Sequence, residues 1–148
     1  MRPAVVLTLL LAAAPLAAQT PADSAAIRAT ALDYIDGWWS GDAGRMEAAV
    51  HPELVKRIVK RLQAADGTGG FEWVDQMGAS RLVQGTAGGG GRETPAADRR
   101  SSVRILDVFQ GTASVRVDAG VWVDYLHLAK VHGRWVILNV LWEMRRPT

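Results

Sequence analysis

Hydrophobic residues recur at helical spacing in the segment 23–40, where they line one side of a predicted helix. Asp23 and Ser24 are residue types that favour a helix N-cap, and the polar turn that begins at Ser40 ends the pattern. The apolar stripe consists of Ile27, Ala31, Tyr34, Ile35 and Trp38. This stripe predicts an amphipathic helix with one face buried against a core.

Two further helical stretches are predicted to follow. Asp42 can cap a short helix at 43–50, which ends before Pro52 because a residue that precedes proline disfavours the helical conformation. Pro52 fits the first turn of a third helix at 53–62. The basic run within it, Lys56-Arg57-Ile58-Val59-Lys60-Arg61, is then interpreted as a solvated helix face whose apolar edge packs inward.

The next part of the chain divides into a turn, a short strand, a helix and a loop. These are predicted at 66–70, 71–74, 76–84 and 85–97. Asp75 is the expected N-cap of the helix, and Met77 and Leu82 are expected to face inward. The loop contains four consecutive glycines, so it is predicted to be mobile.

From Ser102 onwards, apolar residues alternate with polar ones, which is the period of a β-strand. Turn pairs at Gly111-Thr112 and His132-Gly133 separate the apolar runs. Strands are predicted at 103–109, at 113–123 with a continuation to 131, and at 135–144. Because the helices come first and the antiparallel strands follow, the predicted class is α+β with helices on one face of the sheet.

The last hairpin determines which side chains share a face. A two-residue turn at His132-Gly133 places Leu128 opposite Ile137, on the face expected to cover the helices. If the register continues unbroken, Asn139 joins this face as well. A mostly apolar cavity with a few polar groups is typical of a small-molecule site. The candidate pocket residues are Tyr34, Trp38, Met77, Trp122, Asp124 and Asn139.

The same unbroken register makes the opposite face of the sheet apolar too. A monomer rarely exposes such a large apolar patch, so this face is predicted to form a homodimer. The candidate interface residues are Tyr125, His127, Leu138, Val140 and Trp142.

The composition removes several classes of chemistry. The chain of 148 residues has no cysteine, which excludes thiol nucleophiles, disulfides and cysteine-bound metals. A net charge of +2 is too small for recognition of nucleic acid. The three histidines are separated and lack carboxylates at ligand spacing, so neither a metal nor a cofactor is expected.

The N-terminal segment 1–18 has the pattern of a cleaved secretory signal peptide. Arg2 precedes an apolar run, and small residues lead to Ala18. The run is shorter than the roughly 20 residues of a membrane-spanning helix. The sequence therefore predicts export, to the periplasm or out of the cell, with no membrane segment after cleavage.

Several segments together resemble a known family. They are Tyr34-Ile35-Asp36-Gly37-Trp38-Trp39-Ser40-Gly41-Asp42, Met46, His51-Pro52-Glu53-Leu54, Asp75-Gln76-Met77, Leu82-Val83, Asp124-Tyr125-Leu126-His127-Leu128 and Gly133-Arg134-Trp135-Val136-Ile137-Leu138-Asn139. Over residues 23–144 the chain resembles putative lumazine-binding proteins of the nuclear transport factor 2-like superfamily, which includes SnoaL-like and ketosteroid-isomerase-like proteins. The resemblance implies a cone-shaped fold, with a curved antiparallel sheet wrapped around three helices, a pocket at the open end and frequent dimers.

These patterns leave three functional hypotheses. The first is an exported pocket domain that binds a small apolar or aromatic molecule. The second is an isomerase or dehydratase in which Asp124 acts as base and Tyr34 donates a hydrogen bond. The third is a protein-interaction module that uses the outer face of its sheet.

Overall fold

The computed structural model describes residues 20–63 and 69–145. The predicted signal peptide and most of the predicted turn at 66–70 lie outside these ranges. The helices are α1 (Pro21–Ser40), α2 (Ala43–Ala49), α3 (Ala79–Ala87) and the 3-10 helix η1 (Ala96–Asp98). The strands are β1 (Val50–Gln63), β2 (Gly70–Gly78), β3 (Ser101–Phe109), β4 (Thr112–Ala119), β5 (Trp122–Val131) and β6 (Arg134–Met144).

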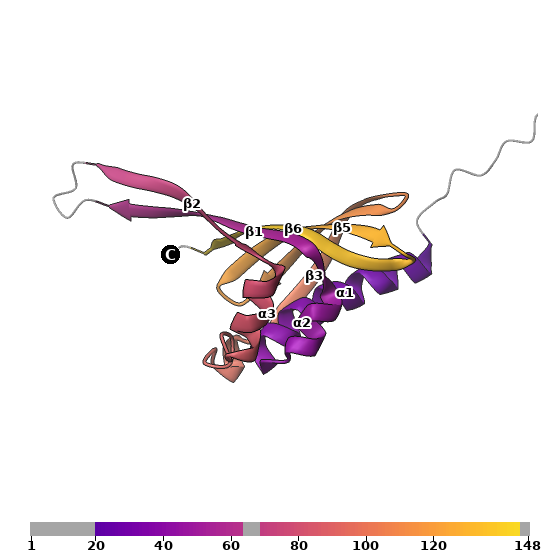
Figure 1. Ribbon diagram of the computed structural model, residues 1–148, viewed down its shortest axis with the longest axis horizontal. Coiled ribbons are helices and arrows are strands. Elements are labelled where there is room, and N and C mark those ends of the chain that lie inside the picture. The colour runs from indigo at the N-terminus through magenta and orange to yellow at the C-terminus, as the bar shows by residue number, and fades with distance from the viewer. Residues whose placement is uncertain (1–19, 64–68, 146–148) are drawn as a thin grey trace, which may run out of the picture.

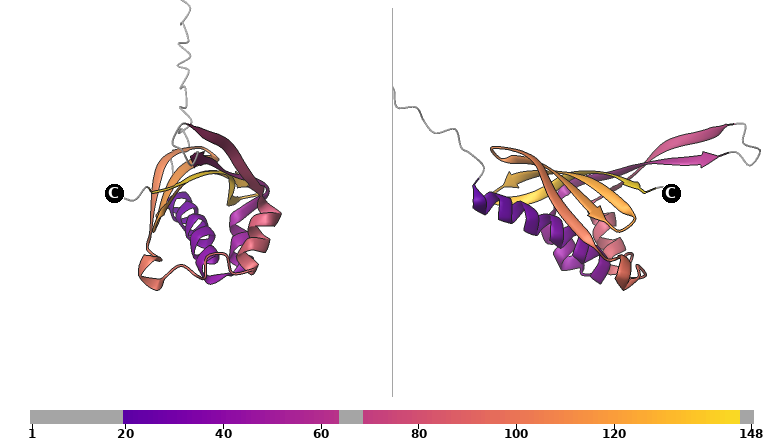
Figure 2. Two further views of the ribbon diagram at one scale, coloured as in Figure 1. Left: turned by 90° about the vertical axis from the view of Figure 1, so that its left-hand side faces the viewer. Right: turned by 180° about the vertical axis from the view of Figure 1, so that it is seen from behind.

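The six strands form one sheet in the order β2-β1-β6-β5-β4-β3. It curves around α1, α2 and α3, which all cover the same face, while the β1–β2 hairpin projects beyond the body (Figures 1 and 2). The predicted α+β class is confirmed. The sheet is mixed rather than wholly antiparallel, because β1 runs parallel to β6.

Local signals explain the first two helices. The Thr20 hydroxyl accepts a hydrogen bond from the backbone N–H of Asp23, and Gly41 ends α1 in the left-handed conformation at φ 69°. Asp42 caps α2 by accepting from the backbone N–H of Arg45. The Arg45 side chain then joins α2 to α1 through ion pairs with Asp33 and Asp36.

The predicted third helix at 53–62 is wrong, because this segment is strand β1. Its backbone pairs with β2 on one side and with β6 on the other, so tertiary pairing overrides an ambiguous local pattern. Pro52 lies in the irregular stretch between Val50 and Val55, where its missing N–H breaks no regular ladder bond. The basic run is therefore not a helix face.

The next two predicted elements are displaced along the chain. The strand expected at 71–74 extends to Gly78, so the helix begins at Ala79 instead of Gln76. Asp75 does not cap this helix. It lies inside β2, where it forms an ion pair with Lys60 of β1.

The glycine segment that follows α3 packs against the first helix. Gly90 and Gly91 lie against Trp38, with no space for a side chain at either position. Arg92 donates a hydrogen bond to the carbonyl of Ser40, which ties the segment to the end of α1. The predicted mobility of 85–97 stays a prediction.

The continuous strand predicted from 113 to 131 is wrong in one respect. Gly120 adopts φ 58° and turns the chain between β4 and β5. A Cβ atom at this position would lie only 2.6 Å from the carbonyl oxygen of Asp98, so both the conformation and the space favour glycine.

The hairpin register is confirmed near its turn and fails farther along the strands. Leu128 pairs with Ile137 as predicted, but a bulge follows, and His127 pairs with Asn139. Beyond the bulge every residue of β6 faces the opposite side from the one predicted, because side chains alternate along a strand.

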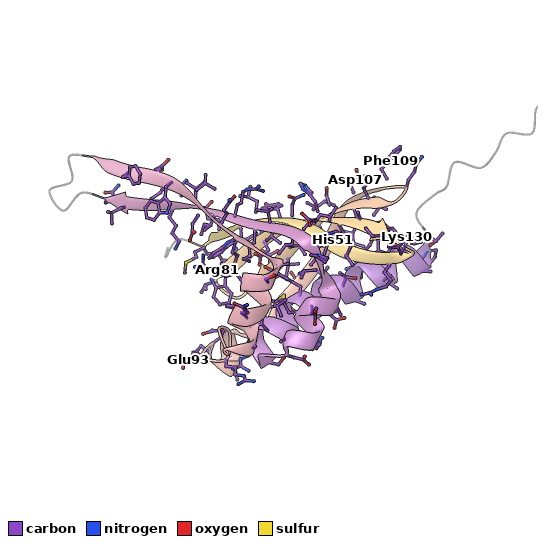
Figure 3. All side chains as sticks on the ribbon, viewed as in Figure 1. His51, Arg81, Glu93, Asp107, Phe109 and Lys130 are labelled. Carbon is purple, nitrogen blue, oxygen red and sulfur yellow. The ribbon has the colours of Figure 1, made fainter. Side chains whose placement is uncertain are left out.

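The core lies between the curved sheet and the helices α1, α2 and α3. Trp135 is buried, and its indole N–H donates a hydrogen bond to Asp23 over 2.9 Å. Lys130, which is labelled in Figure 3 near the start of α1, forms an ion pair with the same carboxylate. The prediction that the face of Trp135, Ile137 and Leu128 meets the helices is confirmed.

Candidate functional site

A cavity of about 250 Å³ lies between the helices and the inner face of the sheet. Its walls come from α1, α2, α3 and strands β1, β2, β5 and β6. The lining residues are Tyr34, Ile35, Trp38, Met46, Lys56, Met77, Leu82, Trp122, Asp124 and Trp142. Nearly all of them are apolar or aromatic, so the cavity offers a largely dry surface to a ligand.

One polar cluster lies within this apolar lining. Lys56 Nζ lies 2.9 Å from Asp124 Oδ1 and also donates a hydrogen bond to the Tyr34 hydroxyl. The Tyr34 hydroxyl in turn donates to the same carboxylate oxygen over 3.4 Å. The Asp124 side chain is only 3% exposed, and that of Lys56 is 12% exposed. Lys56 and Asp124 thus form a buried ion pair, and the Tyr34 hydroxyl is hydrogen-bonded to both of them.

An aromatic wall holds the ammonium group from one further side. Lys56 Nζ lies 4.8 Å from the centre of the Trp142 ring, which is within the range of a cation–π interaction. Its contact with Tyr34 is the hydrogen bond to the hydroxyl. The positive charge is thus surrounded by a carboxylate, a phenol oxygen and one indole ring.

Burial shifts the ionisation of two members of this cluster. Removal from water raises the pKa of Tyr34 well above its usual value of 10.0, and the Asp124 carboxylate raises it further. Burial lowers the pKa of Lys56, although the attraction of Asp124 opposes this change. Each shift favours the neutral form of its group.

Tyr34 is therefore expected to keep its proton above pH 10 while the protein stays folded. Because its folded-state pKa is raised, the unfolded state loses its phenol proton first, and stability falls as the pH rises above 10. Tyrosinate absorbance, measured as the difference between the wild type and Y34F, isolates this group because Tyr125 is the other of the two tyrosines. A Tyr34 phenol that ionises near pH 10 in the folded protein would contradict the burial described above.

The local structure explains why these side chains converge. Tyr34 and Trp38 lie one helical turn apart on the inner stripe of α1, as predicted. On β5, Trp122, Asp124, Leu126 and Leu128 alternate toward the helices. On β1, Leu54 and Lys56 point to the same side, which carries Lys56 into the cavity.

Five of the six predicted pocket residues line this one cavity. They are Tyr34, Trp38, Met77, Trp122 and Asp124. The placement of Asn139 is wrong, because the bulge in β6 turns its side chain outward and leaves it exposed. Whether the five residues bind a ligand stays a prediction.

The bulge also divides the predicted dimer residues between the two faces. Tyr125 and His127 are exposed on the outer face, and Leu138 is half-buried at the bulge. The placement of Val140 and Trp142 on that face is wrong. Val140 belongs to the core, and Trp142 lines the cavity.

Sequence reasoning missed Lys56, the residue that completes the polar cluster. A helical interpretation of 53–62 placed it among solvated charges. Leu54, Lys56 and Ile58 are spaced by two, which is the period of a strand with these three side chains on one face. The further basic residues Lys60 and Arg61 favoured a solvated helix face instead.

Within the described ranges, no group of three or more His, Asp or Glu side chains is arranged to hold a metal ion. No helix among the described residues is long and apolar enough to cross a membrane.

Solved structures with a similar arrangement identify the fold. A protein of unknown function from Shewanella baltica, described as NTF2-like, aligns with a TM-score of 0.58 and 16% identity, over 88% of this chain and 99% of its own. A hexachlorocyclohexane dehydrochlorinase from Novosphingobium barchaimii gives a TM-score of 0.57 and 14% identity, over 86% and 89%. A ketosteroid isomerase-like protein from Erwinia carotovora atroseptica gives 0.53 and 15%, over 86% and 100%. The fold is therefore nuclear transport factor 2-like.

The family follows from the sequence itself. The family model described as putative lumazine-binding matches residues 22–143, which is most of the chain. This protein belongs to that family, and the resemblance noted in the sequence is confirmed. Among curated proteins, none matches the sequence.

Proposed function

We propose that this protein binds a small, flat, mostly apolar molecule in the cavity beside Lys56 and Asp124. The observation that carries the proposal is a partly open apolar cavity with one buried polar cluster on its wall. Apolar walls supply affinity, and a few placed polar groups fix the orientation of a ligand. The opposite charges of Lys56 and Asp124 cancel, which favours a neutral ligand.

The dimensions of the cavity limit the ligand further. Its volume of about 250 Å³ lies just below the usual range for drug-sized ligands, which begins at about 300 Å³. One ring or two fused rings would fit beside the indoles of Trp38, Trp122 and Trp142. Lumazine, the compound in the family's description, is flat and bicyclic, so it matches this size and shape, although its carbonyl and ring-nitrogen groups make it more polar than the ligand proposed here.

The direct test is native mass spectrometry of the purified protein, followed by identification of any small molecule that it releases. Candidate ligands should then quench tryptophan fluorescence, because three indoles line the cavity. Leu82→Phe adds bulk to a buried cavity wall and should weaken binding. Leu141→Phe, at an outer position that is 56% exposed, is the matched control and should not. Equal affinity in both variants would contradict this site.

A second candidate function is acid–base catalysis by Asp124 and Tyr34. The observation in its favour is the hydrogen bond between these two groups inside the cavity. Lys56 and Tyr34 both bind Oδ1 of Asp124, so Oδ2 is the oxygen that would accept a proton from a substrate. Two structural neighbours are described as a dehydrochlorinase and a ketosteroid isomerase-like protein, which supports this candidate only at the level of the fold.

Proton abstraction can be tested without knowing the product. A ligand that copurifies is incubated with the protein in heavy water, and exchange at its C–H positions is followed by NMR. Catalysis by the pair requires exchange that Tyr34→Phe slows. A bound ligand that exchanges no faster than it does free in solution would remove this candidate.

We also propose a homodimer through the outer face of the sheet, or a partner protein on that face. The corrected register still leaves large apolar side chains there, with Tyr125 44% exposed and Leu141 56% exposed. Light scattering at tens of micromolar should give the mass of a dimer, and Tyr125→Glu should give that of a monomer. A wild-type monomer at this concentration counts against self-association.

Export is proposed from the N-terminal pattern alone. Mature protein recovered outside the cytoplasm should begin near Gln19. Exported protein that retains Met1 would contradict cleavage.

A further inference from the structure

The three lysines of this chain lie in very different surroundings. Lys60 is 47% exposed and pairs with Asp75, while Lys130 is 40% exposed and pairs with Asp23. Lys56 is 12% exposed and lines the cavity. All three have a carboxylate partner, so burial in an apolar cavity is what distinguishes Lys56.

The surroundings of Lys56 suit an amine that reacts with carbonyl compounds. A lysine becomes nucleophilic when a dry pocket disfavours its charged form. Burial lowers the pKa of Lys56, and Asp124 lies 2.9 Å away, where it can accept the ammonium proton. The Tyr34 hydroxyl contacts both groups and keeps its own proton in the folded protein.

We propose that Lys56 forms an imine with small aromatic aldehydes or ketones that enter the cavity. This inference rests on the proposed ligand site and gives that site a chemical class of ligand. The geometry that carries it is a lysine amine in a cavity of about 250 Å³, with a carboxylate and a phenol at hydrogen-bond distance.

The reaction balances with the groups present. Lys56 transfers a proton to Asp124, and its free electron pair forms a bond to the carbonyl carbon. The carbonyl π electrons move to the oxygen, which takes the proton from Asp124, with Tyr34 donating a hydrogen bond, to give a carbinolamine. A second proton then moves from nitrogen to the hydroxyl through Asp124, the C–O bond breaks, and water leaves as the C=N bond forms. The sum is Lys56 ammonium plus carbonyl to protonated imine plus water, with Asp124 ionised at the start and at the end and no oxidant or reductant.

The test is reductive trapping with benzaldehyde and sodium cyanoborohydride at neutral pH, followed by peptide mapping. The three lysines compete in one sample, so the comparison is internal. Lys56 should gain a benzyl group about tenfold or more faster than Lys60 and Lys130, because those two lysines lie on the solvated surface outside the cavity. Equal labelling of the three lysines, or slower labelling of Lys56, would overturn the inference.

Benzyl alcohol separates this inference from the ligand site itself, because it has the same ring but cannot form an imine. Quenching of tryptophan fluorescence by the alcohol, without labelling of Lys56 by the aldehyde, refutes the imine and leaves the site intact. If neither the quenching nor the labelling is observed, the imine and the binding of aromatic ligands of this size in the cavity are both refuted.

Two variants complete the experiment. Lys56→Arg keeps the positive charge but cannot form an imine, so the label at position 56 should disappear. Lys60→Arg removes an exposed lysine outside the cavity and should leave the labelling of Lys56 unchanged. If Lys56→Arg does not fold, the wild-type comparison of three lysines still decides the question.

Discussion

Replacing Asp124 with asparagine is expected to lower the free energy of unfolding by up to about 3–5 kcal/mol, because Lys56 then either stays buried as an unpaired charge or gives up its proton. Asparagine has nearly the same shape, so loss of packing contributes little. The Tyr34 hydroxyl would keep an oxygen to donate to, which isolates the effect of charge. Urea unfolding followed by circular dichroism measures the change.

Two controls make this result specific. The double variant K56M/D124L removes both charges and should recover much of the lost stability, because an apolar pair avoids the desolvation of two ions. Asp75→Asn breaks the exposed pair with Lys60 and should have a much smaller effect. If Asp124→Asn loses no more free energy of unfolding than Asp75→Asn, the buried pair contributes no more to stability than the exposed pair does.

The second large effect is expected for Gly91→Val, which should destabilise the protein by about 1–3 kcal/mol through overpacking. A Cβ atom at Gly91 would lie 2.5 Å from Cδ1 of the Trp38 ring and 2.8 Å from the Trp38 carbonyl carbon. Because one contact involves backbone, a rotation of the side chain alone does not relieve it. The indole that lines the cavity must move.

The same variant should therefore change ligand binding as well as stability. Any ligand found by copurification should bind Gly91→Val more weakly than the wild type. Gly111→Ala is the matched control, because the new Cβ would meet only Lys130 Cβ at an ordinary 3.8 Å. Unchanged stability in Gly91→Val would show that α1 and the glycine segment are not packed as described.

The helices α1 and α2 and the last hairpin could be predicted from sequence because their signals are local. Caps at Asp42 and the turn at His132-Gly133 depend on residues close in the chain. Strand β1 could not be predicted in this way. Its hydrogen-bond partners include β6, which lies more than 80 residues later, and only that pairing decides between helix and strand.

The candidate site shows the same division. Tyr34 and Asp124 could be placed inside because each lies on a regular stripe of its own element. Lys56 and Trp142 could not, since one depends on the nature of β1 and the other on the bulge in β6. The sequence thus predicts which way a side chain faces where its element is regular. It does not do so where the type or register of the element depends on a strand far away in the chain.

The bulge in β6 determines which side chains of this strand face the cavity. With the bulge, the strand directs Val140 and Trp142 inward, and the cavity wall is apolar and aromatic. An unbroken ladder over the same residues would direct Asn139, Leu141 and Glu143 inward, giving a polar and acidic wall. One local irregularity of the backbone therefore determines whether this wall of the cavity is aromatic or acidic, with no change in the sequence of the strand.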